Sequence, residues 1–113
     1  MNKTMPKTAT LTVAMLFAGA LSLAAAPAAE NWENTCASCH GADGKGETRQ
    51  GKRLKLKDYT DKSSLAGMTD EQLFRIVSEG VVVEGKQRKR GYKDEFSADE
   101  IKALIQYVRS FAQ

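Results

Sequence analysis

Residues 69–79 carry apolar side chains at the spacing of an α-helix, which predicts a helix with one face on the core. Thr69, followed three positions later by Gln72, is typical of a capping box at the start of such a helix. Gly80 lies where a helix of this length ends. The apolar run of residues 81–83 then predicts a short extended segment that packs against the core.

Residues 97–112 predict a second helix of the same kind. Ser97 and Glu100 repeat the capping box, and Phe96 is placed to pack on Ile101 as a hydrophobic staple. One side of this helix is apolar, at positions Ile101, Leu104, Ile105, Val108 and Phe111.

An earlier, shorter helix is predicted over residues 30–39, where Trp32, Cys36 and Cys39 share one face. The following residues, 41–51, contain four glycines among polar residues. That composition predicts a loop, because glycine lets the backbone turn sharply.

The first 28 residues are predicted to be a secretory signal peptide, followed by one domain over residues 29–113. Lys3 and Lys7 precede an uncharged apolar run, and Ala26-Pro27-Ala28 resembles a small-residue cleavage site. The run is shorter than the roughly 20 residues that span a bilayer. We therefore expect export to the periplasm and no membrane span after cleavage; an uncleaved anchor is the alternative.

Charge is clustered along the chain of 113 residues, which has 17 basic and 14 acidic side chains. Residues 86–93 hold five basic side chains and residues 45–57 hold six. Such clusters steer encounters with an acidic partner, although a solvated loop is the alternative. After removal of Lys3 and Lys7 the chain is nearly neutral and shows no stacking aromatics beside its basic runs, so we expect no nucleic-acid binding.

The only cysteines and the only histidine form one motif, Cys36-Ala37-Ser38-Cys39-His40. Cys-x-x-Cys-His is the spacing of covalent haem attachment: each thiol adds to a vinyl group, and the histidine becomes the proximal iron ligand. A redox dithiol would favour a surrounding βαβ pattern, which is not visible, and a zinc site needs four ligands where the chain offers three. The motif therefore predicts one haem c, with iron, held by Cys36 and Cys39 and ligated by His40.

With this motif the chain resembles the small bacterial class I cytochromes c over nearly all of its length. The resemblance is carried by Cys36 to Gly41, Leu56 to Tyr59, Met68 to Leu73, and Gly91 to Glu95. It implies an all-α fold: a small cytochrome c fold of three to five short helices wrapped around one haem, with the N- and C-terminal helices crossing. Tyr59 is a candidate contact to a haem propionate, or alternatively an ordinary buried tyrosine.

The resemblance also implies an axial methionine three residues ahead of the position matched by Tyr92, and Lys89 stands there instead. A lysine amine binds iron only after losing its proton, and it is a harder donor than a thioether. Lys89 is thus a candidate sixth ligand, with Arg88 and Arg90 expected to lower its pKa. An open or water-bound iron is the alternative.

Met68 is a less favoured candidate for the sixth iron position. It directly precedes the Thr69 cap, where its expected partner is Leu73 in a hydrophobic staple. We therefore expect Met68 to be structural.

These features favour a periplasmic electron-transfer protein that carries one electron, acts as a monomer and docks on acidic redox partners. The chain has no second histidine for a proton shuttle, so we expect no enzyme activity. The alternative function is a haem-based sensor or binder of small ligands such as gases, with an open or lysine-ligated sixth position.

Overall fold

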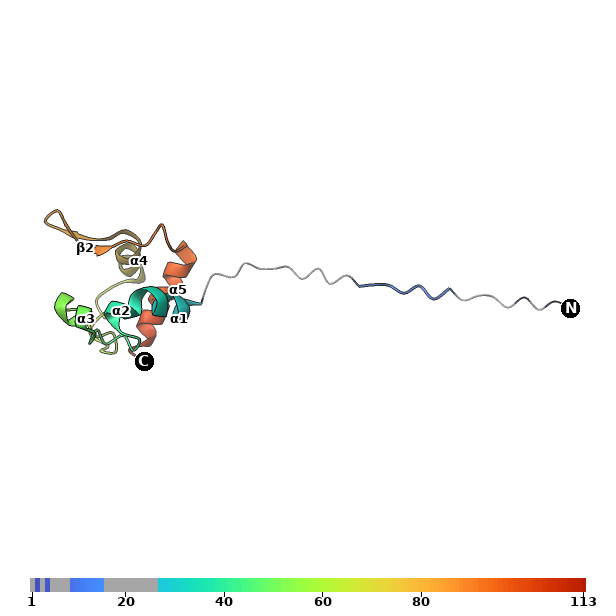
Figure 1. The fold of residues 1–113 in the computed structure, drawn as a ribbon, viewed down its shortest axis with the longest axis horizontal. Helices are drawn as coiled ribbons and strands as arrows, with labels where there is room; N and C mark the ends of the chain where they lie inside the picture. Colours follow the sequence, from blue (N-terminus) through green and yellow to red (C-terminus); the bar gives the residue numbers. More distant parts are fainter. Residues whose placement is uncertain (1, 3, 5–8, 16–26) are drawn as a thin grey trace.

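The computed structural model describes residues 2, 4, 9–15 and 27–113 of the chain (Figure 1). Most of the predicted signal peptide, residues 1–28, lies outside these residues, so its cleavage stays a prediction. None of the helices in the described part of the chain has the length and hydrophobicity that crossing a bilayer requires.

The predicted N-terminal helix is present and is built from three successive segments. These are α1 (Ala28–Asn31), the π-helical η1 (Trp32–Cys36) and α2 (Ala37–His40). Gly41 ends the helix with a φ of 84°, a conformation that glycine adopts without steric cost. Single π-helical turns of this kind are rare and are often found at functional sites.

A short helix, α3 (Arg49–Leu54), lies where the sequence predicted the end of a loop. The Thr48 hydroxyl caps it by accepting a hydrogen bond from the Gly51 amide at 2.9 Å, and Lys55 ends it in the left-handed conformation. The loop prediction for residues 41–51 is therefore wrong for its last three residues.

The two main helices, α4 (Asp70–Glu79) and α5 (Ala98–Ser110), are confirmed together with their capping boxes. In the first box the main-chain N–H of Gln72 donates to the Thr69 hydroxyl at 3.1 Å. The side-chain oxygen of Gln72 accepts from the main-chain N–H of Thr69 at 2.8 Å. Both bonds between Ser97 and Glu100 are 3.1 Å long.

The all-α expectation is wrong in one region, where β1 (Gly80–Val83) and β2 (Lys86–Arg90) form an antiparallel hairpin. The extended conformation predicted for residues 81–83 is confirmed, but its partner strand was not foreseen. The expected packing of this segment against the core is wrong for Val82 and Val83, which are 64% and 46% exposed because they lie next to the exposed turn of the hairpin. The turn residues Glu84 and Gly85 have φ values of 50° and 72°. Two consecutive positive φ values are what a two-residue turn needs to match the twist of a hairpin.

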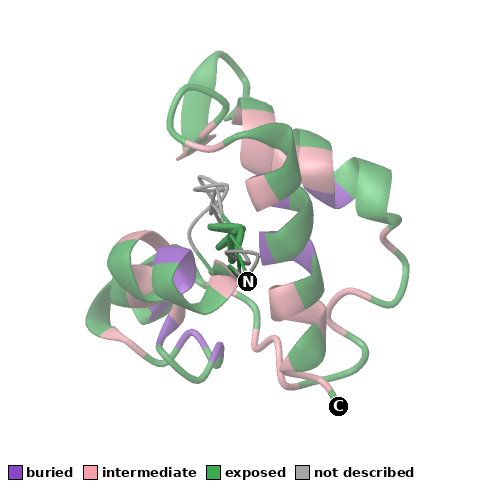
Figure 2. Ribbon diagram, turned by 90° about the vertical axis from the view of Figure 1, so that its right-hand side faces the viewer, coloured by how far each residue is buried: buried purple, intermediate pink, exposed green. Residues whose placement is uncertain are grey.

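The core lies where α4 packs against α5, and Figure 2 shows the buried positions. Leu73, Ile101 and Ile105 form a buried cluster, against which Met68 and Phe96 pack. The first and last helices are also in contact, as expected: α1 packs on α5. An amide of Asn31 in α1 donates to a carboxylate oxygen of Glu100 in α5 at 3.1 Å.

Candidate functional site

The two cysteines lie one helical turn apart at the end of the N-terminal helix. Cys36 ends η1, and Cys39 lies in α2 directly before His40. All three side chains are half-buried, and both thiols are free. The arrangement offers two unoxidised sulfur atoms and an imidazole from one short stretch of helix, as haem attachment requires.

The helix that carries the motif packs against α3. The Thr48 hydroxyl donates a hydrogen bond to the Cys39 carbonyl at 2.5 Å. A Cβ atom at Gly51 would collide with the backbone oxygens of Cys39 and Gly46, so only glycine lets α3 approach this closely. This contact between α3 and the motif was not predicted; the one local sign of it in the sequence is Thr48, three residues ahead of Gly51.

The His40 imidazole is enclosed by aromatic rings. Its ring centroid lies 5.2 Å from that of Tyr59 with nearly parallel planes (19°), and 5.6 Å from that of Trp32. Nδ1 of His40 is buried and has no hydrogen-bond partner among the described residues. Burial lowers the pKa of His40, and the nearby charge of Lys89 lowers it further, so the neutral imidazole that binds metals is favoured.

Lys89 is the one residue of β2 that is not fully exposed. It is paired with Val81 in the register of the hairpin. Arg88 has no opposite residue on β1, because the register shifts between Val81 and Val82. Such a bulge redirects the side chains beside it. The Lys89 ammonium donates to the Arg90 carbonyl at 3.1 Å and lies 4.7 Å from the centre of the Tyr92 ring.

Lys89 and Cys36 of the haem-attachment motif influence each other's pKa values. Burial raises the pKa of Cys36, and Lys89 partly offsets this rise. Burial also lowers the pKa of Lys89, an effect opposed by Cys36 and increased by Arg90. The expected cause, repulsion by neighbouring arginines, is therefore secondary to burial, and only Arg90 contributes.

Met68 belongs to the core cluster that contains Leu73, the packing partner expected for a hydrophobic staple. Its backbone carbonyl accepts a hydrogen bond from Arg109 at 2.7 Å, and Arg109 also pairs with Asp70 at 2.6 Å. These contacts give Met68 a structural role at the junction of α4 and α5.

Tyr59 lies against His40, and its backbone amide donates to the Gly44 carbonyl at 2.8 Å. Burial raises the pKa of its hydroxyl, and Cys36 raises it further. The tyrosine therefore lies within the site, while its contact with a propionate stays a prediction.

These side chains fit a haem better than a bare metal ion. No group of three or more His, Cys, Asp or Glu side chains that could hold a metal occurs among the described residues. A porphyrin brings four nitrogen donors of its own, so the chain needs only the two thiols, the proximal imidazole and a group on the opposite side. The half-buried Cys36, Cys39 and His40 side chains provide the thiols and the imidazole.

The fold and the motif together define a c-type cytochrome, a class of protein that transfers electrons through the iron of covalently bound haem c. The match to a family model makes the assignment more specific. The chain belongs to the family described as "Cytochrome C oxidase, cbb3-type, subunit III", whose model matches residues 23–108. Proteins of this kind are typically electron carriers that work with redox partners.

Solved structures agree with this assignment. The KustC0563 c-type cytochrome superposes with a TM-score of 0.67 and 27% sequence identity, over 76% of this chain and 98% of that chain. A point mutant of the same cytochrome gives a TM-score of 0.65, also at 27% identity, over 75% and 98% of the two chains.

A more distant match shows the fold alone. Dihydro-heme d1 dehydrogenase NirN in complex with DHE has 20% identity and a TM-score of 0.53. The match covers 74% of this chain but only 16% of that longer one. A search of curated proteins found no match.

Proposed function

We propose that this chain is an exported, monomeric carrier of single electrons, built around one haem c. The observation that carries the proposal is the free, half-buried Cys36-x-x-Cys39-His40 motif at a helix end, in a chain that belongs to a c-type cytochrome family. Each thiol would add its S–H across a haem vinyl group, and His40 would bind the iron as proximal ligand. The haem supplies the ferrous–ferric couple.

Lys89 is the sixth ligand in this proposal. The orientation of its side chain supports the role, because Lys89 is half-buried in a strand whose other residues are exposed. Its charge acts on both Cys36 and His40. As a harder donor than a thioether, the amine would favour ferric iron and give a lower reduction potential than methionine ligation.

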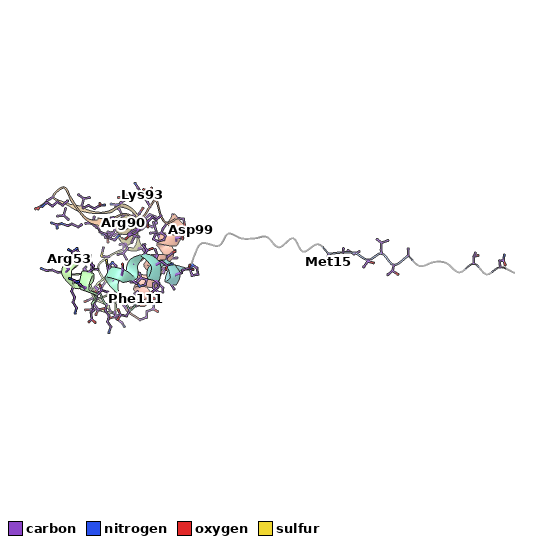
Figure 3. All side chains as sticks on the ribbon, in the orientation of Figure 1. Met15, Arg53, Arg90, Lys93, Asp99 and Phe111 are labelled. Atoms are coloured by element: carbon purple, nitrogen blue, oxygen red, sulfur yellow. The ribbon has the colours of Figure 1, made fainter. Side chains whose placement is uncertain are left out.

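The partner would bind at one basic end of the domain. We define this basic end by Lys52 and Arg53 in α3, Lys55 directly after it, and Lys86 and Arg88 in β2, all of them exposed. In Figure 1, α3 and the turn of the hairpin lie at the same end of the domain, away from the start of α1, and Figure 3 marks Arg53 there. The described residues have no ion pair at these five side chains.

Exposed apolar residues accompany these charges at the basic end: Leu54 at the end of α3, and Val82 and Val83 in β1. An apolar centre within a basic surface suits an acidic redox protein, since charge guides the encounter and apolar contact holds it briefly. We propose such a protein as partner, and no enzymatic reaction at this site.

Export is the part of the proposal that rests on sequence alone. The signal peptide over residues 1–28 would direct the chain to the periplasm and be removed there. Sequencing the N-terminus of the protein recovered from the periplasm tests this: it should begin at Ala29. A chain that retains its first residues would instead be anchored by them.

The function is tested by redox titration and rapid mixing of the haem-loaded protein. We expect a titration curve for one electron, and oxidation of the ferrous form by a one-electron acceptor within milliseconds to seconds. Carbon monoxide should bind the ferrous protein only after acidification releases Lys89. Immediate, stoichiometric binding of carbon monoxide at neutral pH, together with sluggish electron exchange, would favour the ligand-binding alternative.

A further inference from the structure

The proximal ligand of a haem must be held at a fixed rotation about its bond to the iron. A metal-bound histidine is usually held by a hydrogen bond from its second ring nitrogen to a carboxylate, a carbonyl or water. In the described part of this chain, Nδ1 of His40 is buried and has no such acceptor. Another contact must therefore set the orientation of the ring.

The contacts that His40 does make are with aromatic rings. The Tyr59 ring stacks on it at a centroid distance of 5.2 Å and an interplanar angle of 19°. The centroid of the Trp32 ring lies 5.6 Å from that of His40, with an interplanar angle of 42°. These distances lie within the range in which ring pairs attract each other beyond simple burial.

The Trp32 ring and the Tyr59 backbone are each held by a hydrogen bond. Trp32 is buried, and its indole N–H donates to the Gly41 carbonyl at 3.1 Å, directly after His40 in the chain. Tyr59 is tied to the glycine-rich loop by the bond from its amide to the Gly44 carbonyl. Tyr107 of α5 and Phe111, directly after that helix, pack on Trp32 with ring centroids 5.9 and 5.2 Å away, so the C-terminal part of the chain supports Trp32.

We propose that Tyr59, supported by Trp32, is a positioning residue that sets the plane of the His40 imidazole by stacking in place of a hydrogen bond to Nδ1. The inference rests on the proposed role of His40 as proximal ligand. The aromatic ring carries the effect and the hydroxyl does not, so phenylalanine serves equally well at this position. Without an acceptor at Nδ1 the imidazole also lacks the added basicity that a hydrogen bond confers.

Proton NMR of the ferric, haem-loaded protein tests the proposal. The spread of the four haem methyl resonances depends on the plane of the axial imidazole, and neither a lysine amine nor water has a ring plane that would compete. The Tyr59→Phe variant should keep the parent pattern of methyl shifts. The Tyr59→Leu variant should change that pattern or broaden it as the imidazole takes up other rotations.

The Tyr107→Leu variant is the matched control. It removes a ring that packs on Trp32 at 5.9 Å but has no ring contact with His40 among those described. We expect it to lower the melting temperature but to move the methyl pattern much less than Tyr59→Leu does, because Trp32 keeps its bond to the Gly41 carbonyl and its contact with Phe111. The proposal is overturned if Tyr59→Leu leaves the pattern intact, or if Tyr107→Leu moves it as far.

A measurement on the unaltered protein covers the case in which Tyr59→Leu does not fold. In the diamagnetic ferrous form, with carbon monoxide added if the sixth position is open, the ring protons of Tyr59 and His40 should show direct through-space contacts. Their absence would overturn the proposal. Failure of the proposed function is seen separately, as a chain whose mass shows no bound haem.

Discussion

Lys89 shows how a single side chain is placed by the local geometry of a strand. Its neighbours in β2 are exposed, whereas Lys89 is half-buried and lies next to Arg88, which has no opposite residue at the bulge. Partial burial costs solvation of the ammonium group and is the main cause of its lowered pKa. In the proposed role as sixth ligand, a lowered pKa favours the neutral amine that can bind a metal.

Replacing Lys89 by methionine tests its role as the sixth ligand. Because a thioether stabilises ferrous iron relative to an amine, Lys89→Met should raise the reduction potential. The ferric protein should also gain the sulfur-to-iron charge-transfer absorption that the parent lacks. A potentiometric titration with optical spectra measures both effects.

The matched control for that substitution is Met68→Leu, which keeps an apolar side chain in the core cluster. Since we assign Met68 to packing, this variant should leave the potential and the ferric spectrum unchanged. A parent protein that already shows the charge-transfer absorption, and loses it in Met68→Leu, would give the sixth position to Met68.

The pH dependence of the ferric spectrum follows from the direction of the pKa shift. The pKa of Lys89 is lowered by burial, so the neutral amine forms at a lower pH than in a free lysine. Ligation by Lys89 should therefore persist at a pH where exposed lysines are ammonium ions, and disappear as the pH falls and the amine is protonated. A pH titration by absorption and electron-spin resonance checks this, and a spectrum that Lys89→Ala leaves unchanged at every pH would contradict it.

At the scale of elements, the helices follow from short sequence signals. The capping boxes of α4 and α5 are local, since each joins residues three positions apart. They could therefore be predicted from the sequence, together with the apolar stripes that meet in the core. The Cys-x-x-Cys-His motif is equally local, which is why the sequence also indicates the site of haem attachment.

Two elements could not be predicted because their signals are weak or non-local. The strand β2 reads Lys-Gln-Arg-Lys-Arg and has no alternation of apolar and polar residues; it forms because the Glu84–Gly85 turn returns the chain along β1. In α3, Gly51 lowers helix propensity and no apolar stripe is present. Its closeness to Cys39 depends on packing that the sequence does not reveal.

The ring contacts of His40 are non-local in the same sense. Tyr59 is 19 positions away along the chain, and the glycine-rich loop between the two residues gives no periodicity from which their contact could be derived. The sequence predicts Tyr59 as a candidate in the site but does not predict its partner.

Removing the Thr48 side chain tests the contact between α3 and the motif. The hydroxyl both caps α3 and donates to the Cys39 carbonyl. Thr48→Ala should therefore lower the free energy of unfolding by about 1–2 kcal/mol, the upper part of the range for a lost cap. Chemical denaturation of the haem-loaded protein measures this.

An exposed position in the same helix serves as control for the Thr48 substitution. Lys52 is exposed, and Lys52→Ala should change the free energy of unfolding by less than about 0.5 kcal/mol. Equal losses in Thr48→Ala and Lys52→Ala would show that the contact contributes nothing beyond helix propensity.

For the whole molecule, charge is arranged unevenly although its sum is small. The chain carries a formal net charge of +3, yet the basic end has exposed lysines and arginines on α3 and β2, together with exposed apolar side chains of α3 and β1. Uneven charge of this kind affects the rate of encounter more than the strength of the complex.

Reversing one charge at the basic end should slow electron transfer to an acidic redox protein. The Arg88→Glu variant should reduce the second-order rate constant several-fold at low ionic strength, and the difference from the parent should shrink as salt screens the interaction. Stopped-flow mixing over a range of salt concentrations measures the rates. Lys102→Glu, an equal charge change at an exposed position of α5, should have a much smaller effect, and equal effects would contradict a localised docking surface.

The intact mass of the protein recovered from the periplasm, measured after denaturation, tests the central claim most directly. If Cys36 and Cys39 attach haem c, the chain should carry the added mass of one haem that survives unfolding, and a Cys36→Ala, Cys39→Ala double variant should carry none. A bare polypeptide, with its two thiols free or joined in a disulfide, would contradict the account.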